Sequence, residues 1–115
     1  MDRELVAEAR GLIAACSDRA DVAAAVRTTD GQTFTGVNLQ HESGGACAEI
    51  VALARARGAS VSPPAVLVAA RADGVVTPCG RCRQVLWDRF AGTLTVVPLN
   101  DRLVKVDVAH LLPLP

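Results

Sequence analysis

The first stretch of the chain alternates apolar and polar residues at the spacing of an α-helix. Its apolar positions fall three or four residues apart, which places them on one side of a helix that buries that side and exposes the other. We therefore predict an amphipathic helix over residues 2–16. The residues on its apolar side are Leu5, Ala9, Leu12, Ile13 and Cys16. Because Cys16 belongs to this stripe, we expect its thiol to be buried in the core.

The next pattern is that of two strands joined by a tight turn. Residues 21–29 and 32–39 have strand character, and an Asp-Gly pair separates them. Such a pair between two apolar runs is a strong signal for a β-hairpin. The first run is nearly continuous in small apolar residues from Val22 to Val26. This composition is typical of a strand that is covered on both faces.

The remainder of the chain alternates helical and extended segments. Gly44-Gly45 precedes a predicted helix at 46–58, and a third helix is predicted from Cys79 or Gly80 to about residue 91. The predicted buried residues are Ile50, Leu53 and Ala54 in the earlier helix and Val85, Leu86 and Phe90 in the later one. Strands are predicted at 65–70, 93–98 and 103–108, and a short helical tail at 108–112.

This order of elements predicts the fold class. The order α-β-β-α-β-α-β-β-α favours a mixed five-stranded sheet with helices on both faces, a three-layer α/β/α sandwich. With 115 residues and neither a linker nor an internal repeat, we expect one domain, residues 1–115. Both cysteine-bearing helices begin where a strand ends, and sites in open α/β sheets collect at those ends.

Composition and charge narrow the function classes. Apolar residues make up 50% of the chain, and 12 basic residues balance 12 acidic ones. A neutral chain without a Lys/Arg cluster is a poor binder of nucleic acid, because phosphate neutralisation supplies most of that affinity. The sequence shows neither the roughly 20-residue apolar run of a membrane span nor the order of a signal peptide. We expect a cytoplasmic protein, in which four cysteines indicate metal binding or catalysis more than disulfides.

The candidate chemistry lies in two short cysteine motifs. One is Cys47-Ala48-Glu49, and the other is Cys79-Gly80-Arg81-Cys82, which follows a proline. A catalytic zinc site takes three ligands from the protein and keeps its fourth position for water. Cys47, Cys79 and Cys82 would bind Zn²⁺, and Glu49 would move protons without binding the metal. The predicted place at helix N-termini lowers the pKa of a thiol and so favours thiolate ligands.

Two arginines stand beside the second motif. Three thiolates on one Zn²⁺ leave a net charge of about −1, which opposes ionisation of a bound water molecule. Arg81 and Arg83 are the nearest cations in the sequence. Our hypothesis is that one of them donates a hydrogen bond to a ligand sulfur and offsets the excess charge.

Other interpretations of the same residues stay open. Cys-x-x-Cys at a helix start also occurs in thiol oxidoreductases, although Cys47 and Glu49 then have no explanation. A structural zinc site needs a fourth ligand, for which Cys16 and His41 are the candidates. Glu49 alone could be an ordinary carboxylate at a helix N-terminus. Asn38 could be a polar strand end or a substrate contact.

Together these motifs resemble the zinc signature of the cytidine deaminase superfamily, and within it the blasticidin S deaminases. The resemblance implies the three-layer fold, a homotetramer, zinc on the three cysteines, and Glu49 as the proton shuttle on a cytosine ring. The matching residues are Phe34-Thr35-Gly36-Val37-Asn38, His41, Gly44-Gly45, Cys47-Ala48-Glu49, Pro78-Cys79-Gly80-Arg81-Cys82-Arg83-Gln84-Val85-Leu86 and Leu111-Leu112-Pro113.

The resemblance also implies how an aminopyrimidine substrate lies. The backbone from Ala46 to Ala48 would contact the base, and the Thr77 carbonyl would accept a hydrogen bond from the amine. Asn38 would contact the sugar. Nucleoside deaminases carry a ribose-binding Glu where this chain has Gln40, an amide that can still form hydrogen bonds.

The sequence also lacks aromatic residues that enclose the substrate in family members. It contains no tyrosine, and no aromatic residue occurs at 19–22 or at the end of the chain. We therefore expect a pocket that is more open or shaped for a different ring. Blasticidin-type compounds and then cytidine are the expected substrates, with another amino-heterocycle as the alternative.

Overall fold

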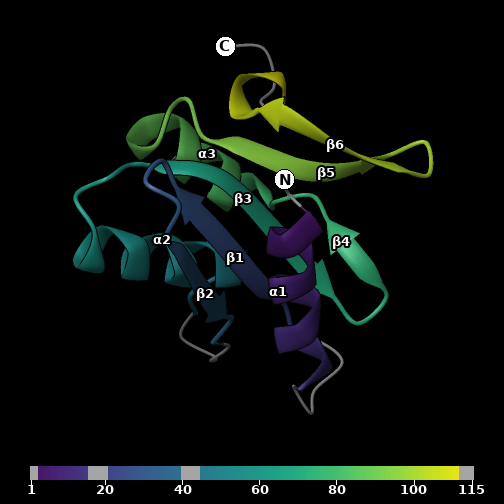
Figure 1. The fold of residues 1–115 in the computed structure, drawn as a ribbon. Helices are drawn as coiled ribbons and strands as arrows, with labels where there is room; N and C mark the ends of the chain where they lie inside the picture. Colours follow the sequence, from purple (N-terminus) through teal and green to yellow (C-terminus); the bar gives the residue numbers. More distant parts are fainter. Residues whose placement is uncertain (1–2, 16–20, 40–44, 112–115) are drawn as a thin grey trace.

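The computed structural model describes residues 3–15, 21–39 and 45–111, and its strands form one mixed sheet (Figure 1). Five strands cross the sheet in the order β2-β1-β3-β5-β6. Their bounds are β1 Ala23–Thr28, β2 Thr33–Val37, β3 Pro64–Arg71, β5 Leu94–Leu99 and β6 Arg102–Asp107. β3 and β5 are parallel, and the other neighbours on this path are antiparallel. The predicted mixed sheet and its five strands are confirmed.

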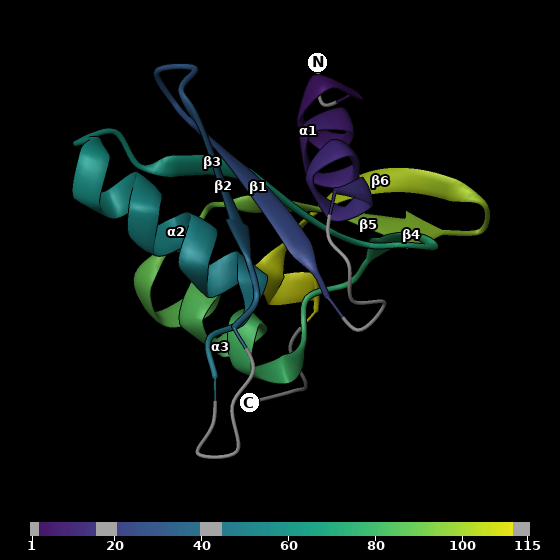
Figure 2. The same cartoon turned by 90° about the horizontal axis from the view of Figure 1, so that it is seen from below.

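Helices cover both faces of this sheet. Helix α1, Arg3–Ala14, lies on one face, whereas α2, Ala48–Ala59, and α3, Gly80–Arg89, lie on the other (Figure 2). One turn of 3₁₀-helix, η1 Val108–His110, follows β6 and packs against α3. The three-layer α/β/α architecture is therefore confirmed. The predicted tail at 108–112 is this 3₁₀ turn in the described residues, and position 112 lies outside them.

Strand β1 belongs to both hydrophobic cores. Its residues from Ala23 to Val26 are all 0% exposed. Side chains alternate between the faces of a strand, so Ala23 and Ala25 join the core under α1, whereas Ala24 and Val26 join the core under α2. This confirms the prediction of a strand covered on both faces.

Helix α2 packs on β2 through small residues. A side-chain carbon at Gly36 in β2 would lie only 2.7 Å from the Ala52 backbone nitrogen and 2.8 Å from Val51 Cγ1. The helix backbone therefore rests directly on the strand. The buried residues of α2 are Ala48, Glu49, Ala52, Leu53 and Ala56. The prediction was right for Leu53 and wrong for Ile50, which is half-buried, and Ala54, which is exposed. The buried face is fixed instead by the contact of the helix backbone at Ala52 with Gly36 of β2.

In α3 a narrow stripe is buried. Cys82 and Leu86 are buried, whereas Val85 and Phe90 are half-buried, contrary to prediction. The cause is that few elements pack on α3 besides α2 and η1, so that neighbouring elements cover less of its surface than they cover of α2.

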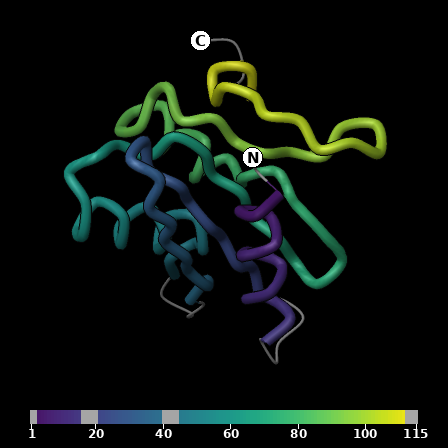
Figure 3. Tube along the Cα trace, in the orientation of Figure 1, coloured from purple at the N-terminus to yellow at the C-terminus, as the bar shows by residue number. Residues whose placement is uncertain are grey.

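A short hairpin connects the sheet to α3. Strand β4, Gly74–Val76, pairs antiparallel with the end of β3, and the tube in Figure 3 shows the chain turning back there. The sequence predicted the turn but not this sixth strand, because three residues are too few to display a period. Gly74 has a φ of 137°, which glycine adopts without strain. The hairpin delivers the chain to Thr77 and Pro78 at the start of α3.

The remaining boundaries agree with the predictions to within a few residues. The first predicted helix, 2–16, is described as Arg3–Ala14, with Leu5, Ala9 and Ile13 buried. Cys16, predicted to be a core thiol, lies outside the described residues. Among the described helices, none has the length and apolar character needed to cross a membrane.

Candidate active site

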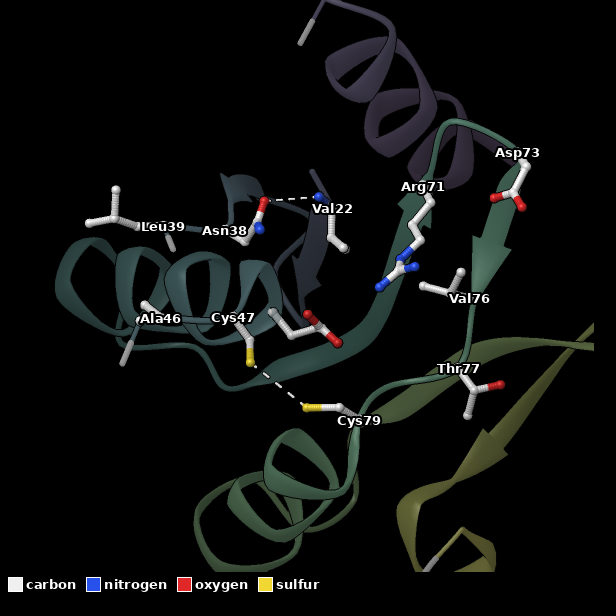
Figure 4. A pocket seen from close by; sticks show the side chains of 12 residues that line it. Val22, Asn38, Leu39, Ala46, Cys47, Arg71, Asp73, Val76, Thr77 and Cys79 are labelled. Carbon is white, nitrogen blue, oxygen red and sulfur yellow. Dashed lines mark hydrogen bonds between the residues drawn. The ribbon is translucent and has the colours of Figure 1, made fainter. Parts of the chain in front are cut away.

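Two helix N-termini bring three sulfur atoms together. Cys47 is the N-cap residue of α2, Cys79 is the N-cap residue of α3, and Cys82 lies in the first turn of α3. The Sγ atoms of Cys47 and Cys79 are 3.7 Å apart, and those of Cys79 and Cys82 are 3.4 Å apart. All three sulfurs lie within 4.8 Å of one another. The predicted convergence of these remote positions is present in the structure, and Figure 4 shows the side chains of Cys47 and Cys79 pointing toward each other.

These distances fit a zinc ion. With Zn–S bonds of about 2.3 Å in tetrahedral geometry, neighbouring sulfurs stand about 3.8 Å apart. The 3.7 Å and 3.4 Å separations are close to that value. Zinc prefers thiolate and imidazole ligands, so the donor set suits it chemically as well. Three protein ligands in this arrangement would leave one tetrahedral corner for another molecule.

The three thiols differ in acidity. Burial raises the pKa of Cys47 and of Cys82, and the Glu49 carboxylate adds to the rise at Cys82. The pKa of Cys79 is lowered, because although burial acts to raise it, hydrogen bonds with the Cys82 backbone N–H and with the other two thiols outweigh burial. The Cys82 N–H donates to Cys79 Sγ at 3.5 Å. Cys79 is thus the readiest thiolate, and a metal must displace protons from the others.

Glu49 lies beside the cluster in the first turn of α2. Its side chain is 5% exposed, yet it lines the same cavity as Cys47 and Cys79. Negative charge is favoured at this end of a helix. Within the described residues the carboxylate has no hydrogen-bond partner. It is therefore buried, adjacent to the sulfurs and available to exchange protons with a bound molecule.

The cavity itself has a volume of about 670 Å³. That volume falls in the range of small-molecule sites. Its lining combines the two cysteine-bearing helix starts, the end of β2 and the β3–β4 hairpin (Figure 4). The lining residues are Val22, Asn38, Leu39, Gly45, Ala46, Cys47, Glu49, Arg71, Asp73, Val76, Thr77 and Cys79.

Several predicted substrate contacts are placed at this cavity. Asn38, Ala46 and Thr77 line it. The Val22 backbone N–H donates to Asn38 Oδ1 at 2.9 Å, which fixes the side chain. The Asn38 NH₂ group has no hydrogen-bond partner among the residues that the structure describes. Ala48 is 0% exposed in the core and its side chain does not line the cavity. Gln40 and His41 lie outside the described residues.

The two arginines make hydrogen bonds to backbone carbonyls. Arg81 donates to the Gly45 carbonyl at 3.0 Å. Arg83 donates through Nε to the Pro78 carbonyl and through a terminal nitrogen to the Leu111 carbonyl, both at 2.8 Å. These bonds hold the segments around the cluster together. Donation to a ligand sulfur is not among the hydrogen bonds of the described part of the chain, and that hypothesis stays a prediction.

Sequence reasoning missed the hairpin side of the cavity. Arg71, at the end of β3, and Asp73, in the following turn, both line it. The available signal was their position: they follow a buried strand and precede the Pro-Cys motif by a few residues. Because sites in α/β sheets collect at strand ends, residues at the end of this strand are candidates for the cavity lining.

Comparison with known proteins identifies the family. A model of the cytidine and deoxycytidylate deaminase zinc-binding region matches residues 2–97. The chain belongs to this family. Zinc is accordingly the cofactor, and the cluster of Cys47, Cys79 and Cys82 provides suitable ligands for it. The resemblance on which the sequence analysis relied is confirmed.

Individual relatives include two kinds of deaminase. The chain is 30% identical to blasticidin-S deaminase of Bacillus cereus over 104 residues, which covers 81% of this chain and 74% of the relative. It is 35% identical to cytidine deaminase of Sporosarcina psychrophila over 97 residues, covering 80% and 71%. The crystal structure of cytidine deaminase from Burkholderia pseudomallei superposes with a TM-score of 0.79 at 27% identity, covering 98% of this chain and 97% of the other.

Proposed function

We propose that this deaminase-family protein releases ammonia hydrolytically from the cytosine ring of a nucleoside or nucleoside analogue of the blasticidin S or cytidine type. The observation that supports this best is the buried Glu49 carboxylate beside three convergent cysteine sulfurs in one cavity. Relatives named for blasticidin S and for cytidine both match most of the chain, so the two substrates lead the list.

The proposed chemistry divides between the metal and the protein. Cys47, Cys79 and Cys82 would hold the zinc ion, which would lower the pKa of a bound water molecule to about 7 and so would supply a nucleophile at neutral pH. Glu49 takes one proton from the water and passes it to the ring nitrogen as the oxygen bonds to C4. It then takes the second proton from that oxygen and gives it to the amino group, which leaves as ammonia when the C4–N bond breaks. The ring gains oxygen at C4 and loses ammonia. Glu49 does this from a site that is 5% exposed, which shields the transfer from bulk water.

The cavity residues supply positioning. The NH₂ group of Asn38 would donate to the sugar or its equivalent, and the Thr77 carbonyl would accept from the ring amine. The backbone from Ala46 to Ala48 would lie against the base, and Gln40 would form a hydrogen bond with the sugar or its equivalent. Arg81 and Arg83 would hold the cluster in place from outside the cavity, as their bonds to the Gly45, Pro78 and Leu111 carbonyls indicate.

The wider context is part of the same proposal. We place the protein in the cytoplasm, where thiols stay reduced and able to bind zinc. We assign residues 1–115 to a single deaminase domain that assembles as a homotetramer and acts on a small molecule and not on nucleic acid.

A Glu49→Gln variant tests the mechanism. The zinc-loaded parent protein is expected to release ammonia from at least one of cytidine, deoxycytidine, cytosine and blasticidin S. Because the amide cannot shuttle protons, the variant is expected to retain zinc and to lose about a hundredfold to ten-thousandfold in turnover. Parental turnover in a zinc-loaded Glu49→Gln protein would refute the mechanism.

The same screen separates the other interpretations. Ammonia release from a different amino-heterocycle alone would redirect the substrate assignment. A metal-free protein with a redox-active Cys79–Cys82 pair would indicate a thiol oxidoreductase. A zinc protein without turnover on any amino-heterocycle, and with a fourth protein ligand, would indicate a structural site.

A further inference from the structure

The cavity carries a cation at the end formed by the β3–β4 hairpin. The Arg71 side chain leaves the last residue of β3 and points its guanidinium group into the cavity (Figure 4). Within the described part of the chain, this group has neither a hydrogen bond nor an ion pair. A long cationic side chain that lies at a cavity and has no partner among the described residues is available to a ligand.

The sheet register directs Arg71 toward the site. Side chains alternate along a strand, and Ala70 belongs to the core under α1, whereas Ala69 belongs to the core under α2 and α3. Arg71 therefore emerges on the α2–α3 face, where the cysteine cluster lies. Pairing of Arg71 with Gly74 in the β3–β4 ladder holds its backbone in place. The direction of the side chain is thus a consequence of the fold.

The charges around the cavity define what Arg71 can bind. Glu49 and Asp73 are the other residues of the described lining with full side-chain charges, and both are acidic. Arg71 is the one cation of that lining. Guanidinium groups bind carboxylates and phosphates through paired, charge-assisted hydrogen bonds. Asp73 is placed at the turn of the hairpin, so an anion extending past Arg71 would meet a like charge, and the site suits one compact anionic group.

We propose that Arg71 is a specificity-determining residue. It binds an anionic group, a carboxylate or a phosphate, that the substrate carries outside its aminopyrimidine ring, and this assignment rests on the proposed function. The cavity has room for such an extension, since its volume of about 670 Å³ exceeds what a single pyrimidine ring fills. The preferred substrate is then a charged cytosine compound and not a neutral nucleoside.

Binding of non-reacting ligands tests this directly. The probes are uridine, uridine 5′-monophosphate and the 5′-carboxylate of uridine, measured by calorimetry on zinc-loaded protein. The parent is expected to bind at least one anionic probe about tenfold to a hundredfold more tightly than uridine. Arg71→Gln is expected to abolish that preference while changing uridine binding less than about twofold, and Arg71→Lys to keep part of it. Arg57→Gln, which changes an arginine in the last turn of α2 and outside the cavity lining, is the matched control.

Two outcomes would overturn the assignment. One is a parent protein that binds all three probes equally well. The other is an Arg71→Gln protein that loses affinity equally for all three, which would indicate a structural role. A preference for the phosphate or for the carboxylate identifies the chemical source of the anion.

Turnover separates this proposal from the proposed function. If the anion preference depends on Arg71 but no cytosine compound releases ammonia, the deaminase assignment fails and the Arg71 site stands. If cytidine and its anionic analogues are deaminated with equal kcat/KM in both the parent and Arg71→Gln, the Arg71 site fails and the deaminase assignment stands.

Discussion

The two ends of the cavity are built in different ways. At one end, three cysteines and Glu49 are held in place by the starts of α2 and α3. Cys82 and Glu49 are the buried members of this group. At the other end, exposed side chains of the β3–β4 hairpin, Arg71 and Asp73, face the cavity. A change in the cluster alters residues that two helix starts hold in place, whereas a change in an exposed hairpin side chain leaves the packing intact. The comparison teaches that the reaction is set by the scaffold and the selectivity by replaceable residues.

The largest effect is expected from Cys82→Ser, which removes a buried ligand at the fixed end. Zinc content should fall below about one tenth of the parental value, and deaminase activity should fall with it. Metal analysis of the purified protein checks this. Cys16→Ser, a change at the cysteine outside the two motifs, is the control and should keep its zinc. A Cys82→Ser protein with full zinc would show that the cluster is not the metal site.

Acidification should also release the metal. The pKa values of Cys47 and Cys82 are raised, so both thiols hold protons at neutral pH and zinc must displace them. Zinc affinity therefore falls as pH falls, by about a hundredfold per pH unit if two protons are displaced. Competition with a chelator, repeated from about pH 6 to pH 8, measures how steeply the zinc affinity changes with pH. A slope of tenfold or less per pH unit would contradict the assignment of two protonated ligands.

Gly36→Ala should destabilise the scaffold beneath the fixed end. The added carbon would lie 2.7 Å from the Ala52 backbone nitrogen, so α2 must shift, at a cost of about 1–3 kcal/mol in the free energy of unfolding. Denaturant unfolding of zinc-loaded protein measures it. Gly58→Ala in the same helix meets no atom within 4 Å and should instead stabilise by up to about 1 kcal/mol. Equal behaviour of the two variants would refute the close α2–β2 contact.

The smallest effect is expected from Asp73→Asn at the replaceable end. The side chain is exposed, so the free energy of unfolding should change by less than about 0.5 kcal/mol. Zinc content should stay at the parental level, and KM for neutral cytosine compounds and for those with one compact anionic group should change by less than about threefold, because only a longer anion would reach Asp73. Loss of zinc on this change would remove the distinction between the two ends of the cavity.

Features that depend on local sequence pattern could be predicted, whereas features that depend on contacts between distant elements could not. The spacing of Cys47, Cys79 and Cys82 and the strand and helix periods were enough to predict the site and the three-layer sheet, because both depend on local pattern. The face of α2 that is buried could not be predicted, since it depends on Gly36 in another element. Strand β4 is three residues long and shows no period. Arg71 became visible as a cavity residue only once the β3 register fixed its direction.

Arg83 joins two distant parts of the chain, because one guanidinium bonds to both the Pro78 and the Leu111 carbonyls. Pro78 immediately precedes Cys79, so a rearrangement of α3 on metal loading would be expected to move Leu111, the residue that follows η1. A fluorophore attached near His110, which is exposed, would therefore give an optical readout of zinc occupancy without altering the cavity.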